Sequence, residues 1–187
     1  ELGKRMGSDL LQGELAGVET GDILAFVSMP AYDPNSFSDG ISRSEWKMLS
    51  EDDHIPLMNK ILQGLYPPGS TVKPMHGLAL LRAGVDPHRR VNCAGVLQVG
   101  NGRFHCHKRG GHGPLDMRGA IAQSCDIYFY QLARELGYDA FAPTVRDLGL
   151  GAEYDLPYPS QRYGTVPDSA WKQRKYNESW TVADSLN

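Results

Sequence analysis

The chain has 187 residues, of which 41% are hydrophobic and 22% are charged, and its formal net charge is −3. These values are ordinary for one globular domain with a core of its own, and they exclude a disordered or collagen-like chain. No block of like charges occurs, which argues against a nucleic-acid partner. No apolar run reaches the length of about 18 residues that a membrane span needs. Any membrane anchor or export signal is therefore expected to lie outside this sequence.

The first half of the chain gives few periodic signals. Residues 1–17 are weakly patterned and are interpreted as a poorly defined N-terminal segment. The almost continuous apolar run 23–29 predicts a strand covered on both faces, although residues 12–18 are a poor candidate for its neighbour. Residues 30–69 are rich in Pro and Gly and predict a long loop region with a helical turn at 44–49.

Helical patterns dominate after Ser70. An apolar stripe predicts a helix from about Ser70 that ends before Gly84, a residue typical of helix C-termini. Pro74 fits this helix because proline is tolerated in the first turn. Further along, the pattern predicts an irregular stretch at 85–114, a mostly helical stretch at 115–137 that ends at Gly137, and a third helix at 138–148.

Ser70 and Lys73 form an S-x-x-K motif, which is the signature of serine acyl-transfer enzymes. Residues i and i+3 of a helix share a face, so Lys73 is placed beside the serine hydroxyl. A hydroxyl is a weak nucleophile and needs such a base, while the helix N-terminus favours a developing oxyanion. The four letters alone are equally consistent with a capping serine followed by a solvated lysine. The rigid Pro-Pro-Gly turn before Ser70 favours a serine fixed at the mouth of a cleft.

The surroundings of Ser70 resemble a known family. The stretch 65–74 (LYPPGSTVKP) is similar to the active-site region of class B penicillin-binding proteins. The stretch 21–35 (GDILAFVSMPAYDPN) is similar to their core strand and the loop that follows it. Two further stretches, 108–113 (KRGGHG) and 124–130 (SCDIYFY), indicate the elongation-specific branch, because the division-specific branch has Ser-x-Asn where this chain has Ser-Cys-Asp.

The resemblance implies a penicillin-binding, serine-transpeptidase fold of the α/β (α+β) class, with an antiparallel sheet flanked by helices and an all-helical subdomain. It implies a serine-type D-Ala-D-Ala transpeptidase that crosslinks peptidoglycan stem peptides, is acylated by β-lactams and needs no cofactor for catalysis. Ser70 would attack the penultimate D-Ala carbonyl, Lys73 would take the proton, and Ser124 would relay it to the leaving D-Ala. Asp126 would hydrogen-bond Lys73 or the substrate amide. The alternative is that Ser124 and Asp126 only cap a helix.

The resemblance also implies a cellular setting. The protein would serve cell elongation and rod-shape maintenance at the periplasmic face of the bacterial inner membrane, anchored by an N-terminal helix that is not in this sequence. Its partners would be a glycosyltransferase of the SEDS family, RodA, and MreC. The family's third motif, Lys-Thr/Ser-Gly, does not occur. Residues 18–187 are therefore interpreted as a partial transpeptidase domain that lacks this strand, the pedestal domain and the anchor, and is inactive by itself.

The three cysteines fall within one short stretch of the chain. Cys93, Cys106 and Cys125, together with His112, make a possible closed set of zinc ligands, although their spacing matches no common finger. Asp126, His105 or His107 could supply the fourth ligand instead of His112. A metal would order an irregular loop beside Ser124. The alternatives are a Cys93–Cys106 disulfide with Cys125 buried, or three unlinked thiols.

Trp180 is a weak candidate for a substrate contact, and His76 is expected at the surface. The alternatives to a transpeptidase are a penicillin-sensing receptor domain, which also carries S-x-x-K, and a non-catalytic binding module. A β-lactamase would need a deacylating glutamate, and no motif here supports one.

Overall fold

The computed structural model describes residues 12–16, 19–20 and 22–186 and divides the chain into two compact units. The first unit consists of Glu1–Tyr66 and Tyr154–Tyr163, and the second of Pro67–Glu153 and Gly164–Asn187. Of the N-terminal segment expected at 1–17, only Gln12–Ala16 is described. None of the helices in the described part of the chain is long and apolar enough to cross a membrane.

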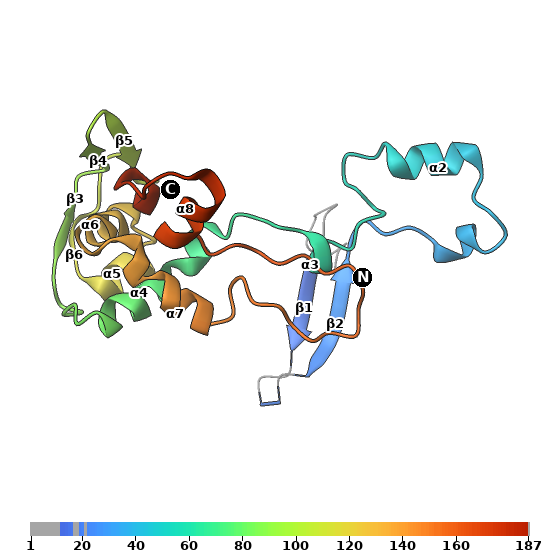
Figure 1. Cartoon of the computed structure of the whole chain (residues 1–187), viewed down its shortest axis with the longest axis horizontal. Coiled ribbons are helices and arrows are strands. Elements are labelled where there is room, and N and C mark those ends of the chain that lie inside the picture. Colours follow the sequence, from blue (N-terminus) through green and yellow to red (C-terminus); the bar gives the residue numbers. More distant parts are fainter. Residues whose placement is uncertain (1–11, 17–18, 21, 187) are drawn as a thin grey trace. The chain divides into compact units, whose positions relative to one another are not determined.

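The first unit contains a two-stranded antiparallel sheet (Figure 1). Strand β2 (Ile23–Ser28) confirms the strand predicted at 23–29, and its partner is β1 (Gln12–Ala16). The sequence reading that found no neighbour in this stretch was wrong, because β1 lacks the apolar alternation that marks a strand. The prediction of burial on both faces was also wrong, since the Leu24 side chain is 65% exposed.

The expected loop region of the first unit contains more helix than its composition suggested. It includes a 3₁₀ turn (Pro34–Phe37), α2 (Arg43–Ser50) and α3 (Lys60–Gln63). Helix α2 begins where the Ser42 hydroxyl accepts a hydrogen bond from the Glu45 amide. The segment Tyr154–Tyr163 joins this unit through the stacking of Tyr158 on Phe26, with ring centroids 5.5 Å apart.

The second unit carries all of the predicted catalytic and metal-binding residues. Its elements are a 3₁₀ turn (Gly69–Val72), α4 (Lys73–Arg82), β3 (Val91–Cys93), β4 (Val96–Val99), β5 (Gly102–His105), β6 (Gly113–Leu115), α5 (Met117–Ala122), α6 (Asp126–Leu136), a 3₁₀ turn (Tyr138–Ala140), α7 (Ala142–Asp147), α8 (Ser169–Tyr176) and a 3₁₀ turn (Ala183–Leu186). Strand β3 pairs with β6 and β4 with β5, both antiparallel. Helices thus lie beside short antiparallel strand pairs, which agrees with the predicted mixed class.

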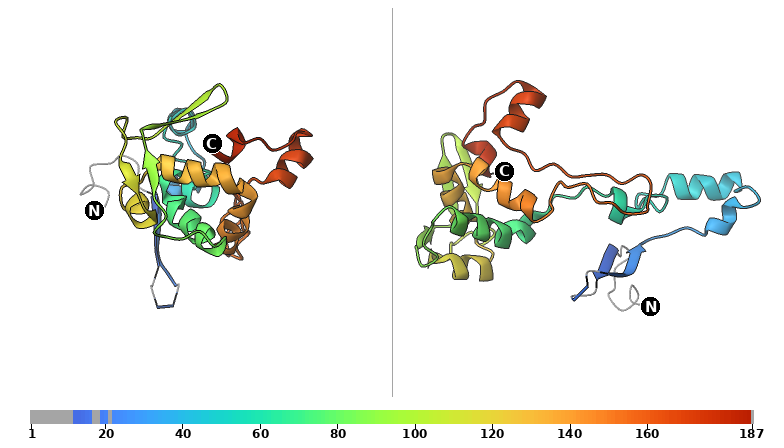
Figure 2. Two further views of the ribbon diagram at one scale, coloured as in Figure 1. Left: turned by 90° about the vertical axis from the view of Figure 1, so that its left-hand side faces the viewer. Right: turned by 60° about the horizontal axis from the view of Figure 1, so that its bottom comes forward.

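Helix α6 is the centre of this unit (Figures 1 and 2). It contacts α4, α5 and strands β3, β4 and β5. Its buried face repeats at helical spacing through Ile127, Tyr128, Leu132 and related positions. Leu132 and Leu80 of α4 are both fully buried in the same core. Burying a leucine side chain contributes about 2 kcal/mol, so these contacts fix α4 against α6.

The helical stretch predicted at 115–137 is interrupted at Ser124 and Cys125. Helix α5 ends in a Schellman motif, in which the Ser124 and Cys125 amides donate to the carbonyls of Ile121 and Ala120 at 3.1 and 2.8 Å. Ser124 takes the left-handed position of this motif with φ +50°. Glycine usually occupies that position, so a serine there is no recognisable stop signal. The predicted stop at Gly137 is confirmed by its φ of +77°.

Two other predicted helices are also divided. The helix expected from Ser70 starts as the 3₁₀ turn Gly69–Val72 and becomes α4 at Lys73. The third predicted helix consists of a 3₁₀ turn and α7, which meet at Phe141.

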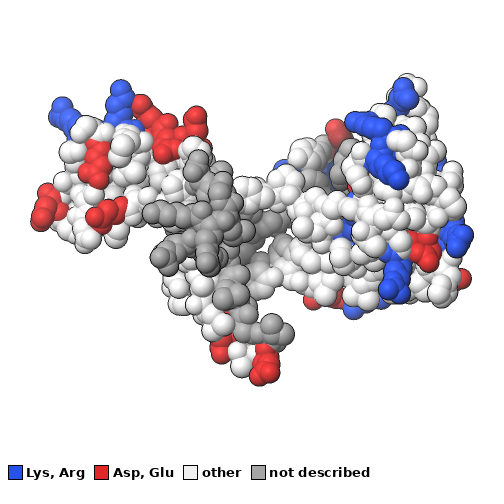
Figure 3. All heavy atoms as spheres, turned by 180° about the vertical axis from the view of Figure 1, so that it is seen from behind, with Lys and Arg blue, Asp and Glu red and all other residues white. Residues whose placement is uncertain are grey.

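Charge is unevenly divided between the units. Asp and Glu outnumber Lys and Arg in the first unit, whereas Lys and Arg outnumber Asp and Glu in the second. Figure 3 shows the contrast on one face, where acidic side chains gather around α2 and basic ones lie over the second unit. The formal net charge of −3 is therefore the sum of a negative charge on the first unit and a smaller positive charge on the second.

Candidate active site

Ser70 is presented by a tight turn at the start of the second unit. Gly69 has a left-handed backbone with φ +55°, which an L side chain rarely adopts. The Thr71 hydroxyl donates to the Pro68 carbonyl at 2.6 Å and closes the turn. The Ser70 carbonyl then accepts the Lys73 amide, which links the turn to α4. Ser70 is exposed to solvent, and its hydroxyl has no hydrogen-bond partner among the described residues.

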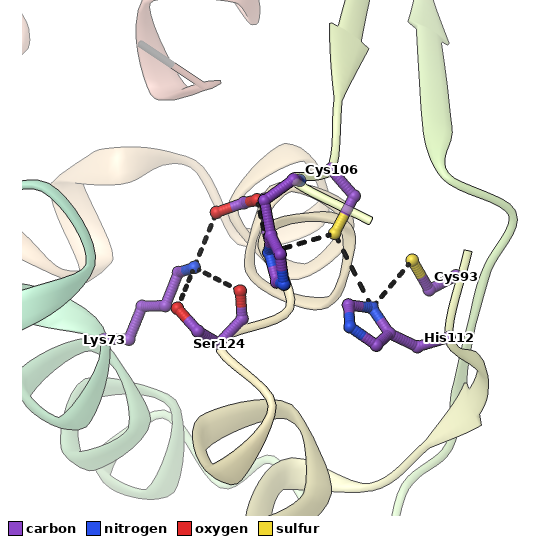
Figure 4. A network of polar contacts seen from close by, with 7 residues as sticks. Lys73, Cys93, Cys106, His112 and Ser124 are labelled. Atoms are coloured by element: carbon purple, nitrogen blue, oxygen red, sulfur yellow. Dashed lines mark hydrogen bonds and ion pairs between the residues drawn. The ribbon is translucent and has the colours of Figure 1, made fainter. Parts of the chain in front are cut away.

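Lys73 reaches from the first turn of α4 to the segment between α5 and α6 (Figure 4). Its ammonium donates to the Ser124 carbonyl at 2.7 Å, to Ser124 Oγ at 3.0 Å and to Asp126 Oδ1 at 2.5 Å. An ammonium group has three N–H donors, so these three acceptors satisfy it completely. Lys73 is only 8% exposed. The structure therefore brings Lys73 together with Ser124 and Asp126, which lie 51 and 53 residues further along the chain.

The strained conformation of Ser124 makes this contact possible. Because its φ is positive, both its carbonyl and its hydroxyl face Lys73. Non-glycine residues in this region cost free energy and cluster at functional sites. The alternative that Ser124 and Asp126 cap a helix is wrong, because the N-cap of α6 is Cys125, whose side chain caps nothing.

Asp126 uses its two oxygens in two directions. Oδ1 accepts from Lys73, while Oδ2 accepts the His107 backbone amide at 3.0 Å. Burial raises the pKa of Asp126, but the hydrogen bonds from Lys73 and from the His107 amide outweigh it and lower the pKa below its usual value. Asp126 is therefore a carboxylate that pairs with Lys73.

The predicted metal ligands lie on the other side of Asp126. Cys93, Cys106, His112 and Cys125 place their ligand atoms within 4.8 Å of one another. His112 Nδ1 lies 3.5 Å from Cys93 Sγ and 3.6 Å from Cys106 Sγ. The cysteines form no disulfide. A second group of potential ligands, Cys106, His107 and Asp126, shares one thiol with the first, whereas His105 belongs to neither group in the described part of the chain.

The environment gives the cluster residues different proton affinities. Burial raises the pKa of the Cys125 thiol to about 12. Burial also opposes ionisation of Cys93, but backbone amides of His112 and Gly95 lower the pKa of this thiol overall. Burial lowers the pKa of His112, helped by the neighbouring positive charge of Lys108. His112 is thus held as a neutral imidazole, the form that binds metals.

A cavity of about 450 Å³ opens beside Lys73 and Asp126. Its apolar lining comes from α6, the stretch from Tyr138 to α7 and the 164–167 segment, and it includes Phe129, Tyr138 and Phe141. His76 also lines it, and its ring lies 5.2 Å from that of Phe141. The expectation that His76 is at the surface was therefore wrong. Its position three residues after Lys73 on the same helix was the only sequence signal for this placement.

Trp180, the candidate substrate contact, packs behind the cavity lining. Its ring stacks on Tyr138 with centroids 5.9 Å apart, and its indole N–H donates to Ser185 Oγ at 2.9 Å. Both partners line the cavity, but Trp180 does not. These contacts favour a packing role, and the substrate contact stays a prediction.

Comparisons with known proteins agree with this architecture. The model of the penicillin-binding protein transpeptidase domain matches residues 15–184, and the chain belongs to this family. The chain is homologous to the peptidoglycan D,D-transpeptidase MrdA of Salmonella typhimurium (strain SL1344), with 37% identity over 186 residues, 95% of this chain and 30% of that protein.

Solved structures show the same likeness. The penicillin-binding protein PBP2 of Helicobacter pylori superposes with a TM-score of 0.90 at 32% identity, covering 99% of this chain and 35% of that one. The same protein in complex with MreC gives 0.87 at 34% identity, covering 92% and 32%. The penicillin G acyl-enzyme of penicillin-binding protein A from M. tuberculosis gives 0.71 at 28% identity, covering 86% and 40%. The penicillin-binding transpeptidase fold predicted from sequence is thus confirmed.

The chain spans about a third of the length of these relatives, 30% in MrdA and 35% in PBP2. The activity, substrates and partners of the whole protein are therefore inferred rather than carried over with the fold.

Proposed function

We propose that this chain carries the nucleophile of a D,D-transpeptidase that crosslinks peptidoglycan stem peptides and is acylated by β-lactams. One observation supports this most directly: the lysine of the S-x-x-K motif is buried and hydrogen-bonded to the serine and aspartate of a second motif. A capping serine followed by a solvated lysine would not converge with distant polar groups in this way. The family membership agrees with the proposal.

The proposed reaction uses three residues of the site. Lys73, an ammonium in this structure, first loses one proton to solvent. Ser70 Oγ then attacks the carbonyl carbon of the penultimate D-Ala, and its proton passes to the Lys73 amine. The hydroxyl of Ser124, 3.0 Å from Lys73 Nζ, relays this proton to the nitrogen of the departing D-Ala. The peptide C–N bond breaks and an ester on Ser70 remains. An amine from a second stem peptide then attacks the ester, which forms the crosslink and restores the serine hydroxyl.

Asp126 has an orienting role in this scheme. Its carboxylate holds the Lys73 amine at a fixed place beside Ser124, and it lies 20% exposed at the edge of the cavity. The substrate's stem peptide would lie along the apolar cavity beside this polar edge.

Fluorescent penicillin labelling tests the proposal. Labelling is measured on the chain as given and on a protein of the relatives' length that contains it. We expect the longer protein to be labelled, and Ser70→Ala to abolish labelling. Ser50→Ala, which changes an exposed serine of α2, serves as the matched control and should label normally. Labelling that survives Ser70→Ala would refute Ser70 as nucleophile, while labelling without any crosslinked product would favour a penicillin-sensing receptor.

We further propose that Cys93, Cys106, His112 and Cys125 hold a structural zinc ion. Zn–S bonds of about 2.3 Å and Zn–N bonds of about 2.0 Å at the tetrahedral angle require S···N separations of about 3.5 Å. The separations from His112 Nδ1 to the two nearest thiols, 3.5 and 3.6 Å, fit this value. The ligands come from β3, the segment after β5, the segment before β6 and the start of α6. A metal would therefore tie these four segments together at one point.

Metal analysis and thiol counting test the zinc site. We expect about one zinc per purified chain, and all three thiols free after denaturation with a chelator. His112→Ala should reduce zinc retention, whereas His105→Ala, which changes a nearby histidine outside the ligand group, should not. A single titratable thiol would instead support the Cys93–Cys106 disulfide and refute the zinc proposal.

We also propose a setting for this activity. The protein would act at the periplasmic face of the inner membrane in cell elongation, with MreC and a SEDS-family glycosyltransferase such as RodA as partners. The likeness to a PBP2 that was solved with MreC supports the first partner. Co-purification of MreC with the protein of full relative length tests it, and no enrichment over a MreC-free control would count against it.

A further inference from the structure

Asp126 contacts both the catalytic group around Lys73 and the segment that carries the thiol ligand Cys106. One oxygen is bound by Lys73, and the other is bound by the backbone amide of His107. His107 directly follows Cys106, one of the four clustered ligands. A single carboxylate therefore lies between the proposed catalytic lysine and the segment that carries Cys106. Figure 4 shows Lys73 and Ser124 beside Cys106, Cys93 and His112.

The Cys106–His107 segment is held mainly by its backbone and by the thiol. The Cys106 amide donates to the Gly95 carbonyl at 2.9 Å, and the thiol is 1% exposed. The His107 side chain, by contrast, is 55% exposed. Its Nδ1 lies 3.6 Å from Asp126 Oδ2 and 3.8 Å from Cys106 Sγ, distances too long for strong hydrogen bonds to the ring. The hydrogen bond from His107 to the Asp126 carboxylate comes from the backbone amide, at 3.0 Å.

We propose that His107 is a positioning residue, whose backbone amide transmits the position of metal-bound Cys106 to Asp126 and thereby places Lys73 for acylation of Ser70. The inference rests on the proposed functions of Lys73 and of the thiol cluster. Metal bound at Cys106 fixes the start of the segment, the amide fixes one carboxylate oxygen, and the other oxygen fixes the lysine. Loss of the metal frees the segment and leaves the carboxylate able to rotate.

This arrangement predicts that loss of the His107 amide contact slows the acylation of Ser70 and leaves the initial binding of a β-lactam unchanged. Neither Cys106 nor His107 lines the cavity beside Lys73. A β-lactam should therefore form its initial complex equally well whether or not the segment is fixed. The subsequent attack needs the lysine in place, and misplacement of a catalytic group lowers the rate of this step.

The test separates the amide from the ring. His107→Pro removes the N–H donor, whereas His107→Ala keeps it and removes only the ring. Arg109→Pro is the matched control, because it places a proline in the same loop at the second position of the turn closed by the Gly111 amide and the Lys108 carbonyl. Each variant is made in the zinc-loaded protein of the relatives' length. Stopped-flow acylation with a chromogenic β-lactam gives the affinity of the first complex and the acylation rate constant separately.

We expect His107→Pro to lower the acylation rate constant by about tenfold or more, as for the loss of one hydrogen bond to a charged group, with the affinity of the first complex unchanged. The acylation rate constants of His107→Ala and Arg109→Pro should stay within about twofold of the parent value, since both variants keep the backbone N–H of residue 107. The Co²⁺-substituted proteins should all show the same visible absorption, because none of the changes replaces a proposed ligand.

Metal removal provides an independent arm that does not depend on the folding of a proline variant. Chelation should lower the acylation rate constant by a similar factor with the initial affinity unchanged, and zinc should restore it. Three results would overturn the inference: an unchanged rate constant in metal-loaded His107→Pro, an unchanged rate constant after metal removal, or a changed cobalt spectrum in His107→Ala, which would make the ring a ligand. Failure of the parent protein to react with the β-lactam would instead defeat the proposed transpeptidase function.

Discussion

We predict that the protein becomes less stable as the pH falls below neutral, because the folded state keeps His76 uncharged. Its ring is packed beside Phe129, Tyr138 and Phe141, and burial, together with the positive charge of Lys73, lowers its pKa from 6.5 to about 4. In this range the unfolded chain binds a proton at His76 that the folded chain does not. Stability is therefore lost as the pH falls through 6.5 and stops changing near 4.

The magnitude follows from the two pKa values. The full difference corresponds to about 3 kcal/mol, and between about pH 7 and about pH 4.5 the loss is about 2 kcal/mol. Replacing His76 by phenylalanine keeps an aromatic ring in the same surroundings and removes the proton-binding group. The pH dependence of His76→Phe should thus be smaller by about 2 kcal/mol over this range.

The assay is urea unfolding at several pH values, followed by tryptophan fluorescence. Trp180 contributes to this signal and stacks on the same Tyr138 ring that contacts His76. Other groups that titrate here, including Asp126 and any protons taken up on metal loss, contribute equally to both proteins and cancel in the difference. A His76→Phe profile parallel to that of the parent protein would show that the histidine is not held neutral by its surroundings, and the reasoning would be wrong.

Three other substitutions test the framework of the site. Gly69→Ala should destabilise the protein by about 1 kcal/mol in denaturant unfolding because its φ is positive, whereas Gly110→Ala, with equally open space and no positive φ, should be near neutral. Lys73→Met should cost about 2 kcal/mol by leaving a largely buried carboxylate without its partner, and it should abolish penicillin labelling. Lys47→Met, which breaks the ion pair of a lysine side chain that is 71% exposed, should change neither stability nor labelling by a measurable amount. Leu132→Ala should cost about 3 kcal/mol, and a change below about 1 kcal/mol would mean that the α6 core relaxes around the lost side chain.

The sequence alone was sufficient for features that depend on neighbours along the chain. The S-x-x-K spacing, the Pro-Pro-Gly turn and the stop at Gly137 depend on local backbone preferences and helical geometry, so they can be recognised without a partner. The order of the motifs was also enough to indicate the transpeptidase family. The grouping of Cys93, Cys106, His112 and Cys125 was expected from their occurrence in one stretch, and the structure brings their ligand atoms together.

Tertiary structure decided what depends on residues far apart in the chain. The pairing of β1 with β2, the burial of His76 and the convergence of Lys73 on Ser124 arise from packing that no local pattern encodes. Ser124 illustrates the physical reason most clearly. Its left-handed backbone is unfavourable for serine by itself and is held by the helix ends on both sides, so propensity predicted a continuous helix where the fold makes a break. That break turns Ser124 toward the lysine and leaves Asp126 between Lys73 and the thiol cluster.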